Sequence, residues 1–129
     1  MARFVANRRE MDHMLKSPNG MVGSYLKQRG AALRVLASRQ VGTKTYRLKR
    51  SITSILKTNS SGELMVQVGS DSPIAFIHHN GTKPHTIKPR FKRALRFQQH
   101  GKIVFASVVK HPGTKPNKYL TDNLPKVID

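Results

Sequence analysis

The sequence predicts an α+β fold: an N-terminal helical arm packed on a small antiparallel β-sheet, with a long basic loop and a short C-terminal helix. Apolar residues recur at helical spacing early in the chain, and further on they alternate with polar residues between Gly- and Pro-rich turns. A length of 129 residues is enough for one domain with one core. We therefore expect a single domain, with residues 1–42 as the helical arm and residues 43–129 as the β-rich part.

The N-terminal arm carries two helix signals. Apolar residues suggest a short helix from Arg8 to Lys16, which ends because the residue before a proline avoids helical angles. Ser17-Pro18 then offers an N-cap followed by proline, so we expect a second helix from about Pro18 to Gln40. Three glycines act against this second helix. Its expected apolar stripe consists of Val22, Tyr25, Leu26, Ala32, Leu33 and Leu36.

The middle of the chain predicts strands. Residues 46–56 fit a helical turn that runs into a strand, and the cluster Asn59-Ser60-Ser61-Gly62 marks a turn. Apolar and polar residues then alternate over residues 63–68, as in a half-buried strand. We expect a further strand from Ile74 to His78.

A β-hairpin follows. Leu95 and Phe97 alternate with polar residues, and His100-Gly101 turns the chain into a second strand from Lys102 to Val109. Upstream, residues 80–93 are basic and contain two prolines, which cannot lie inside a sheet, so we expect a long exposed loop.

One short motif occurs twice. H-x-G-T-K-P is found at residues 79–84 and again at residues 111–116. We interpret the copies as two similar turns that leave two strands on the same edge of the sheet. Gly permits a left-handed backbone angle and Pro fixes the exit, which presents Lys83 and Lys115 to a partner.

The composition is strongly basic and poor in core residues. Lys and Arg number 24 against 6 Asp and Glu, a net charge of +18 that attracts nucleic acid, an acidic protein or anionic lipid, unless it only keeps the subunit soluble. The 37% hydrophobic fraction without Trp makes a lean core, so oligomerisation is expected to bury part of the apolar surface. No apolar run approaches the about 20 residues of a membrane span, and we expect no membrane partner.

Enzymatic chemistry has little support in the residues. The chain has no Cys, its six acidic residues are scattered, and it lacks nucleophile-elbow, P-loop and dinucleotide patterns. His78, His79 and His85 form the densest His group, but adjacent strand residues point to opposite faces. We expect no enzyme activity, no catalytic residue, no cofactor and no metal site.

The basic loop is the candidate binding surface. Only one aromatic residue, Phe91, is interleaved with its cations, so base stacking is poorly supported and any nucleic-acid contact should be independent of sequence. A solvated loop or an acidic protein groove explains the charge equally well. The residues expected to contact DNA or an acidic partner are Lys83, Lys88, Arg90, Lys92, Arg93 and Lys115.

The C-terminal half resembles a known family. A-L-R-F at residues 94–97, G-K-I-V-F at residues 101–105, K-H-P-G-T-K-P at residues 110–116 and Tyr119-Leu120 follow one another in order. This order is similar to the neck, or tail-completion, proteins of long-tailed bacteriophages, the minor tail proteins likened to the lambda protein Z. L-K-R-S-I at residues 48–52 and the approach to Gly81-Thr82 also resemble the family. His79-Asn80 departs from it where a Glu is common, and Tyr119 stands where Phe is usual.

The resemblance implies a structural virion protein. Such a subunit would assemble as a ring between the capsid portal and the tail tube, contact other neck and tail proteins, and let DNA pass through. Expected interface anchors are Tyr119, Leu120 and Leu124. It would form in the host cytoplasm and reside in the virion neck or tail. The alternative is a basic module that binds nucleic acid without sequence preference.

Overall fold

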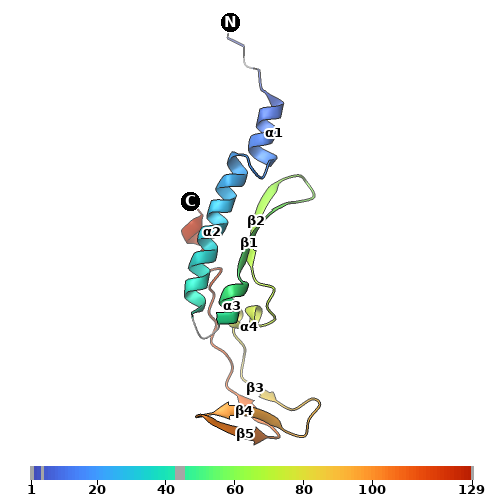
Figure 1. Cartoon of the computed structure of the whole chain (residues 1–129), viewed down its shortest axis with the longest axis vertical. Helices are drawn as coiled ribbons and strands as arrows, with labels where there is room; N and C mark the ends of the chain where they lie inside the picture. The colour runs from blue at the N-terminus through green and yellow to red at the C-terminus, as the bar shows by residue number, and fades with distance from the viewer. Residues whose placement is uncertain (1, 4, 43–45, 129) are drawn as a thin grey trace.

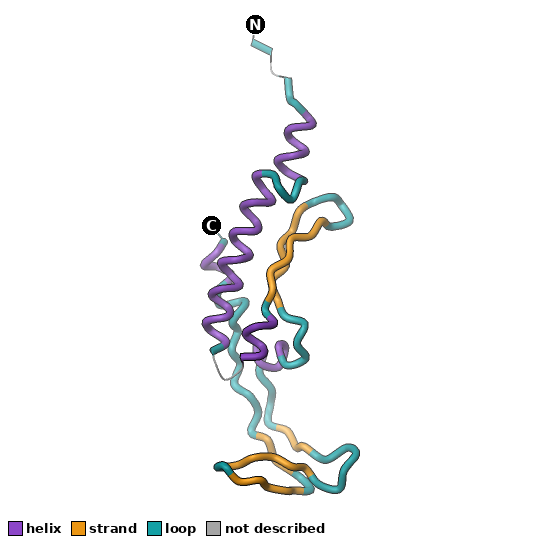
Figure 2. Tube along the Cα trace, viewed as in Figure 1, coloured by secondary structure: helices purple, strands orange, loops and turns teal. Residues whose placement is uncertain are grey.

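The computed structural model describes residues 2–3, 5–42 and 46–128; residues 1, 4, 43–45 and 129 lie outside the described residues. The α+β fold is confirmed, and the chain is elongated (Figures 1 and 2). The helices are α1 (Arg8–Lys16), α2 (Met21–Val41), α3 (Tyr46–Ser51), α4 (Ala75–Asn80) and α5 (Leu124–Val127). The strands are β1 (Thr53–Thr58), β2 (Leu64–Gly69), β3 (His85–Ile87), β4 (Leu95–Gln99), β5 (Lys102–Ala106) and β6 (Val109–His111). The strands form three separate antiparallel pairs, β1–β2, β3–β6 and β4–β5.

Helix α1 has the predicted bounds, but the predicted start of the second helix is wrong. Asn7 caps α1 by accepting a hydrogen bond from the backbone N–H of Glu10 at 3.3 Å. Ser17 ends α1 instead of capping α2, because its N–H donates to the His13 carbonyl at 3.2 Å. Helix α2 begins after Gly20, whose lack of a side chain lets the turn approach the last turn of α1.

The glycines that weaken the helix signal of α2 lie on its buried face. Gly23 and Gly30 are buried together with Leu33, whereas Tyr25 and Ala32 of the predicted stripe are exposed. A Cβ atom on Gly30 would lie 2.5 Å from Val66 Cγ2 and would also meet the Ser54 hydroxyl. Glycine therefore lets the backbone of α2 approach the β1–β2 hairpin closely.

The β1–β2 hairpin and the helical turn before it agree with the prediction. Its register runs from Thr53 opposite Gly69 to Thr58 opposite Leu64. Gly62, with φ of 81°, provides the left-handed residue of the connecting turn. Side chains on one face of the hairpin are half-buried toward α2, and those on the other face are mostly exposed.

The strand predicted at Ile74 to His78 is wrong, because these residues belong to α4. The backbone N–H of His78 donates to the Ile74 carbonyl at 2.9 Å, and Gly81 ends the helix with φ of 72°. Only Ala75 of this helix is buried. The tertiary contact of Ala75 with the core overrides the strand propensity of the Phe-Ile pair.

The core lies where α2, α3, α4 and the C-terminal segment meet. Tyr119 is 1% exposed, and its hydroxyl donates to the Ala75 carbonyl at 3.2 Å. The core cluster consists of Ala37, Val41, Leu48, Ile52, Ala75 and Tyr119. We refer to α2, α3, α4, α5 and the β1–β2 hairpin around this cluster as the body.

A polar cluster, which we call the Gln40 clasp, ties the C-terminal segment to α2. The side-chain amide of Gln40 donates to Asn117 Oδ1 at 2.9 Å and to Asp122 Oδ2 at 3.0 Å. Asn123, which is buried, donates to Gln40 Oε1 at 2.7 Å. These bonds hold the chain where it returns to the body and leads into α5, the predicted short C-terminal helix.

Among the described residues, none of the helices combines the length and the apolar character needed to cross a membrane.

Candidate assembly site on the distal ribbon

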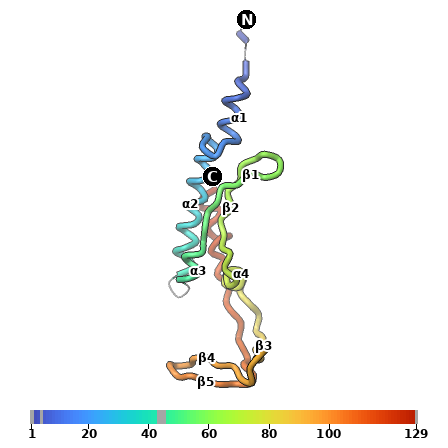
Figure 3. Tube along the Cα trace, turned by 45° about the vertical axis from the view of Figure 1, so that its right-hand side comes forward, coloured from blue at the N-terminus to red at the C-terminus, as the bar shows by residue number. Residues whose placement is uncertain are grey.

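A long two-stranded ribbon leaves the body at the end opposite the N-terminus (Figures 1 and 3). Thr82 bridges Thr114, and β3 pairs with β6 from His85 opposite His111 to Ile87 opposite Val109. The Thr82–Thr114 bridge and the β3–β6 pairs share one antiparallel register, so the bridge continues the pairing of these two strands toward the body. We call residues 82–114 the distal ribbon.

The two copies of H-x-G-T-K-P face each other at the base of this ribbon. They were expected to be two similar turns that leave two strands on the same edge of the sheet; that interpretation is wrong, because the first copy begins at the end of helix α4 and pairs with the second. Gly81 and Gly113 have φ of 72° and 90°. A Cβ atom on Gly81 would lie 2.5 Å from the Thr114 carbonyl oxygen, and one on Gly113 would meet the Thr82 carbonyl oxygen. Each glycine thus makes room for the backbone of the other copy.

Four of the six histidines form ring contacts, in two places. His78 and His79, expected on a strand, lie on α4, and their ring centroids are 5.8 and 5.1 Å from that of Tyr119. His85 and His111 stack across the ribbon at 4.9 Å, and the Gly113 N–H donates to His111 Nδ1 at 3.0 Å. In the part of the chain that the structure describes, no three His, Asp or Glu side chains gather as metal ligands would.

The predicted hairpin forms as β4–β5 at the far end of the ribbon, which we call the tip. Its second strand ends at Ala106 and not at Val109 as predicted, because Val109 belongs to β6 and pairs with Ile87. His100 and Gly101 connect its strands with φ of 50° and 78°, the pattern of a two-residue type I′ turn. Leu95, Phe97 and Val104 lie half-buried on one face. On the other face Ile103 is 56% and Phe105 65% exposed.

The predicted cationic residues are all exposed, and the structure distributes them over the ribbon. Residues 80–93 are not one loop as expected, because β3 occupies residues 85–87. Lys83 and Lys115 belong to the paired motifs, with Lys115 one residue beyond the ribbon, while Arg90 and its neighbours lie between β3 and the tip. Residues 72–121 contain no Asp or Glu and ten exposed cations: Lys83, Lys88, Arg90, Lys92, Arg93, Arg96, Lys102, Lys110, Lys115 and Lys118.

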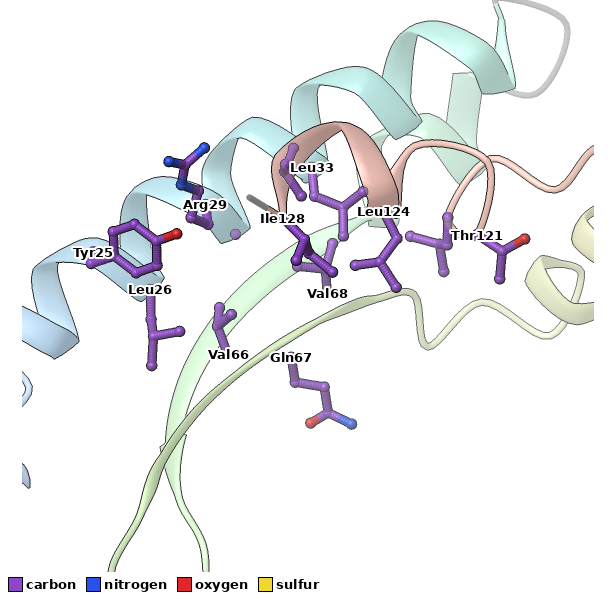
Figure 4. Close-up of a pocket in the computed structure, with 13 residues that line it drawn as sticks. Tyr25, Leu26, Arg29, Leu33, Val66, Gln67, Val68, Thr121, Leu124 and Ile128 are labelled. Carbon is purple, nitrogen blue, oxygen red and sulfur yellow. The ribbon is translucent and has the colours of Figure 1, made fainter.

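The predicted interface anchors separate into two groups. Tyr119 is buried in the core of its own chain, so it cannot dock on a neighbour as expected. Leu120 and Leu124 line an apolar groove of about 530 Å³ on the body. Figure 4 shows that the labelled residues that line this groove come from α2, β2 and the C-terminal segment.

The exposed aromatic and aliphatic side chains of the ribbon were not predicted as site residues. Phe91 is 97% exposed, and Ile103 and Phe105 face outward from the tip. A signal for them exists in the sequence: Ile103 to Ala106 is a continuous apolar run, which is typical of a strand covered on both faces. None of the described residues covers the outer face of this strand, where Ile103 and Phe105 remain exposed.

Comparison of the chain with protein-family models, with curated proteins and with solved structures finds no match.

Proposed function

We propose that the chain is a structural subunit of the head-to-tail connector of a long-tailed bacteriophage, and that it assembles as a ring through its distal ribbon. The resemblance of residues 94–120 to neck and tail-completion proteins supports this proposal. The observation that carries it is the apolar tip, β4–β5, which extends from the body without a core of its own.

An exposed tip of this kind needs a partner. A two-stranded hairpin alone is at best marginally stable in water. Ile103, Phe105 and Phe91 remain largely exposed, although burying such a side chain fully contributes about 1.5 to 3 kcal/mol. Another subunit that covers the tip would therefore stabilise both the hairpin and the assembly.

The apolar groove on the body is the surface that we assign to receive the tip of the next copy. Its walls include Leu120 and Leu124. The elements that line it, α2, β2 and α5, lie away from the tip of the same chain (Figure 1). A contact between two different surfaces of identical chains is heterologous, and such contacts close into rings when the rotation allows it. Tip and groove thus supply the two halves of a ring contact.

The charge of the subunit opposes this assembly on its own. Copies with a formal charge of +18 repel one another, and screening or a polyanion is required to offset the repulsion. DNA passing through the ring, or acidic surfaces of other neck and tail proteins, would supply the negative charge to the exposed cations of the ribbon.

The experiment that tests the connector role is deletion of the gene in the phage that encodes it. We expect DNA-filled heads and separate tails, with joining restored by the wild-type chain. Purified wild-type virions should contain the chain in a small fixed copy number. Normal joined particles from the deletion would reject the connector role.

A second function is favoured by the absence of carboxylates from residues 72–121: sequence-independent nucleic-acid binding as the main activity. This function predicts affinity for duplex DNA that falls steeply with salt and ignores sequence. A chain that binds DNA in this way, yet whose deletion leaves particles joined, would fit the second function and not the first.

A further inference from the structure

The body carries a second groove, lined by cations that the sequence does not place together. It has a volume of about 500 Å³ and lies between α2, α3 and the β1–β2 hairpin, which lie alongside one another in Figure 3. Lys27, Arg34 and Arg39 reach it from α2, and Lys49 reaches it from α3. None of the residues that line it is acidic.

These cations have no anionic partner in the described part of the chain. The one ion pair found there joins Lys16 and Asp12 on α1. Lys49 is half-buried, and four like charges that line one groove repel one another. The groove is therefore electrostatically incomplete without an anion.

Arg34 is held in place for such a ligand. Its Nε–H donates to the Ile52 carbonyl at 3.0 Å, which fixes the plane of the guanidinium group. A fixed guanidinium presents its remaining N–H donors in a fork that fits phosphate oxygens. The hydroxyl groups of Ser38 and Ser54 line the same groove and add neutral donors.

The length of the cationic stripe indicates a linear ligand. Lys27 and Arg39 are twelve positions apart on α2, which corresponds to about 18 Å along the helix axis. A single phosphate ion is much shorter than this. One strand of duplex DNA carries a phosphate about every 3.4 Å of axis, so the stripe can face about five phosphates.

We propose that this groove, lined by Lys27, Arg34, Arg39 and Lys49, is a binding site for the phosphate backbone of nucleic acid. It is separate from the cations of the distal ribbon, and the proposal holds whether or not the chain is a connector subunit. An acidic peptide is the weaker candidate, because the groove has no aromatic or Met side chain to anchor a peptide. Contacts to phosphate alone give no preference for sequence.

The test uses two triple variants of the full chain with equal loss of charge. The groove variant is Lys27→Gln, Arg39→Gln, Lys49→Gln. The control variant is Arg47→Gln, Lys57→Gln, Lys118→Gln, whose side chains are exposed and line neither groove. Binding of a fluorescent duplex of mixed sequence is measured between 50 and 200 mM salt.

We expect the slope of log affinity against log salt to become shallower by about 3 in the groove variant, about 1 for each lost phosphate contact. The control variant should change this slope by less than about 1. Equal changes in both variants would overturn the proposal, because they would show attraction by net charge alone.

Two further measurements keep the test independent of variant folding and of ligand class. On duplex addition to the wild-type chain, the amide NMR signals of Lys27, Arg34 and Ser54 should shift more than those of Arg47 and Lys57; the reverse would overturn the proposal. Polyglutamate of similar charge should displace the duplex only at much higher concentration. If polyglutamate competes equally and loses affinity equally in the groove variant, the site takes acidic peptides and the nucleic-acid assignment is wrong.

Discussion

Thr82 and Thr114 exchange both of their backbone hydrogen bonds: the Thr82 N–H donates to the Thr114 carbonyl at 3.0 Å, and the Thr114 N–H donates to the Thr82 carbonyl at 3.1 Å. The Thr114 N–H also lies 3.0 Å from the Thr82 hydroxyl oxygen. This pair closes the base of the distal ribbon, where the chain leaves the body and returns to it. The position of the tip therefore depends on the two glycines beside the pair.

Replacing Gly81 by Ala should loosen the base of the ribbon. Gly81 has φ of 72° and ψ of 177°, a conformation that costs other residues about 1 to 3 kcal/mol. The added Cβ would also lie 2.5 Å from the Thr114 carbonyl oxygen. We expect the free energy of unfolding, measured in urea, to fall by about 2 to 5 kcal/mol in total. Amide exchange at Thr114 should become faster.

Gly42→Ala is the matched control for this substitution. Gly42 has nearly the same conformation, with φ of 79° and ψ of −175°, but among the described residues, its chain neighbours apart, no atom lies within 4 Å of its Cβ position. The free energy of unfolding of Gly42→Ala should fall only by the cost of the backbone conformation, about 1 to 3 kcal/mol. Equal losses of unfolding free energy in the two variants would mean that Gly81 does not lie in close contact with the Thr114 carbonyl oxygen.

Phe105→Ser should prevent self-association without unfolding the subunit. Phe105 is 65% exposed on the tip, so the stability of the monomer should change by less than about 0.5 kcal/mol. Phe76→Ser on α4 is the control, because Phe76 is 74% exposed but lies outside the ribbon. Sedimentation velocity at moderate salt should show oligomers for the wild type and the control, and monomers for Phe105→Ser. Oligomers of Phe105→Ser would exclude the tip from the contact.

The Tyr119 hydroxyl should make the fold sensitive to alkaline pH. Burial raises the pKa of Tyr119 above its usual value of 10.0, because the phenolate is disfavoured away from water. The resulting stability is fully present below pH 10 and is lost as the pH rises through the higher pKa of the folded chain. Tyr119→Phe removes the hydrogen bond to the Ala75 carbonyl. Its free energy of unfolding at neutral pH should therefore be lower than that of the wild type by about 1 kcal/mol.

The difference in unfolding free energy between wild type and Tyr119→Phe, measured from pH 8 to 12, should therefore shrink above pH 10. Subtracting the two profiles cancels the titration of the many lysines, which both chains share. Tyr25→Phe, at an exposed tyrosine, should follow the wild-type profile. A difference that stays constant with pH would contradict the buried environment of the phenol.

The hydrogen bonds of the Gln40 clasp should stabilise the fold, and the contributions of Gln40 and Asn123 should depend on each other. Gln40→Ala removes one of the two 2.7 Å acceptors of the buried Asn123 amide and leaves the other, the Tyr119 carbonyl; the N–H group that loses its partner should cost about 1 to 3 kcal/mol. In a double-mutant cycle with Asn123→Ala, the two losses should be non-additive by at least about 0.5 kcal/mol. Gln28→Ala, at an exposed position of the same helix, should change stability by less than about 0.5 kcal/mol. Additive losses would show that the clasp bonds are weak in solution.

Elements that depend on local signals could be predicted from the sequence. Helix α1 has the predicted bounds because Pro18 follows its end closely, and the tip hairpin forms where His100-Gly101 supplies two left-handed residues. Exposure of the cations also follows from their charge, since unpaired Lys and Arg are rarely buried.

Elements that depend on distant partners could not be predicted. Helix α4 has the composition of a strand, but the contact of Ala75 with Tyr119 decides its conformation. Tyr119 itself looks like a free aromatic anchor until the segment that carries it folds back onto α2. The pairing of the two motifs joins residues 32 positions apart, and periodicity carries no information on such pairing.

A ring held by the tip of one copy on the body of the next would be visible in cryo-electron microscopy of the particle neck. We expect a closed ring of this chain between portal and tail tube, with Phe105 covered by the Leu120 and Leu124 groove of the adjacent copy. A neck that lacks the chain, or a ring in which Phe105 faces solvent, would contradict the account.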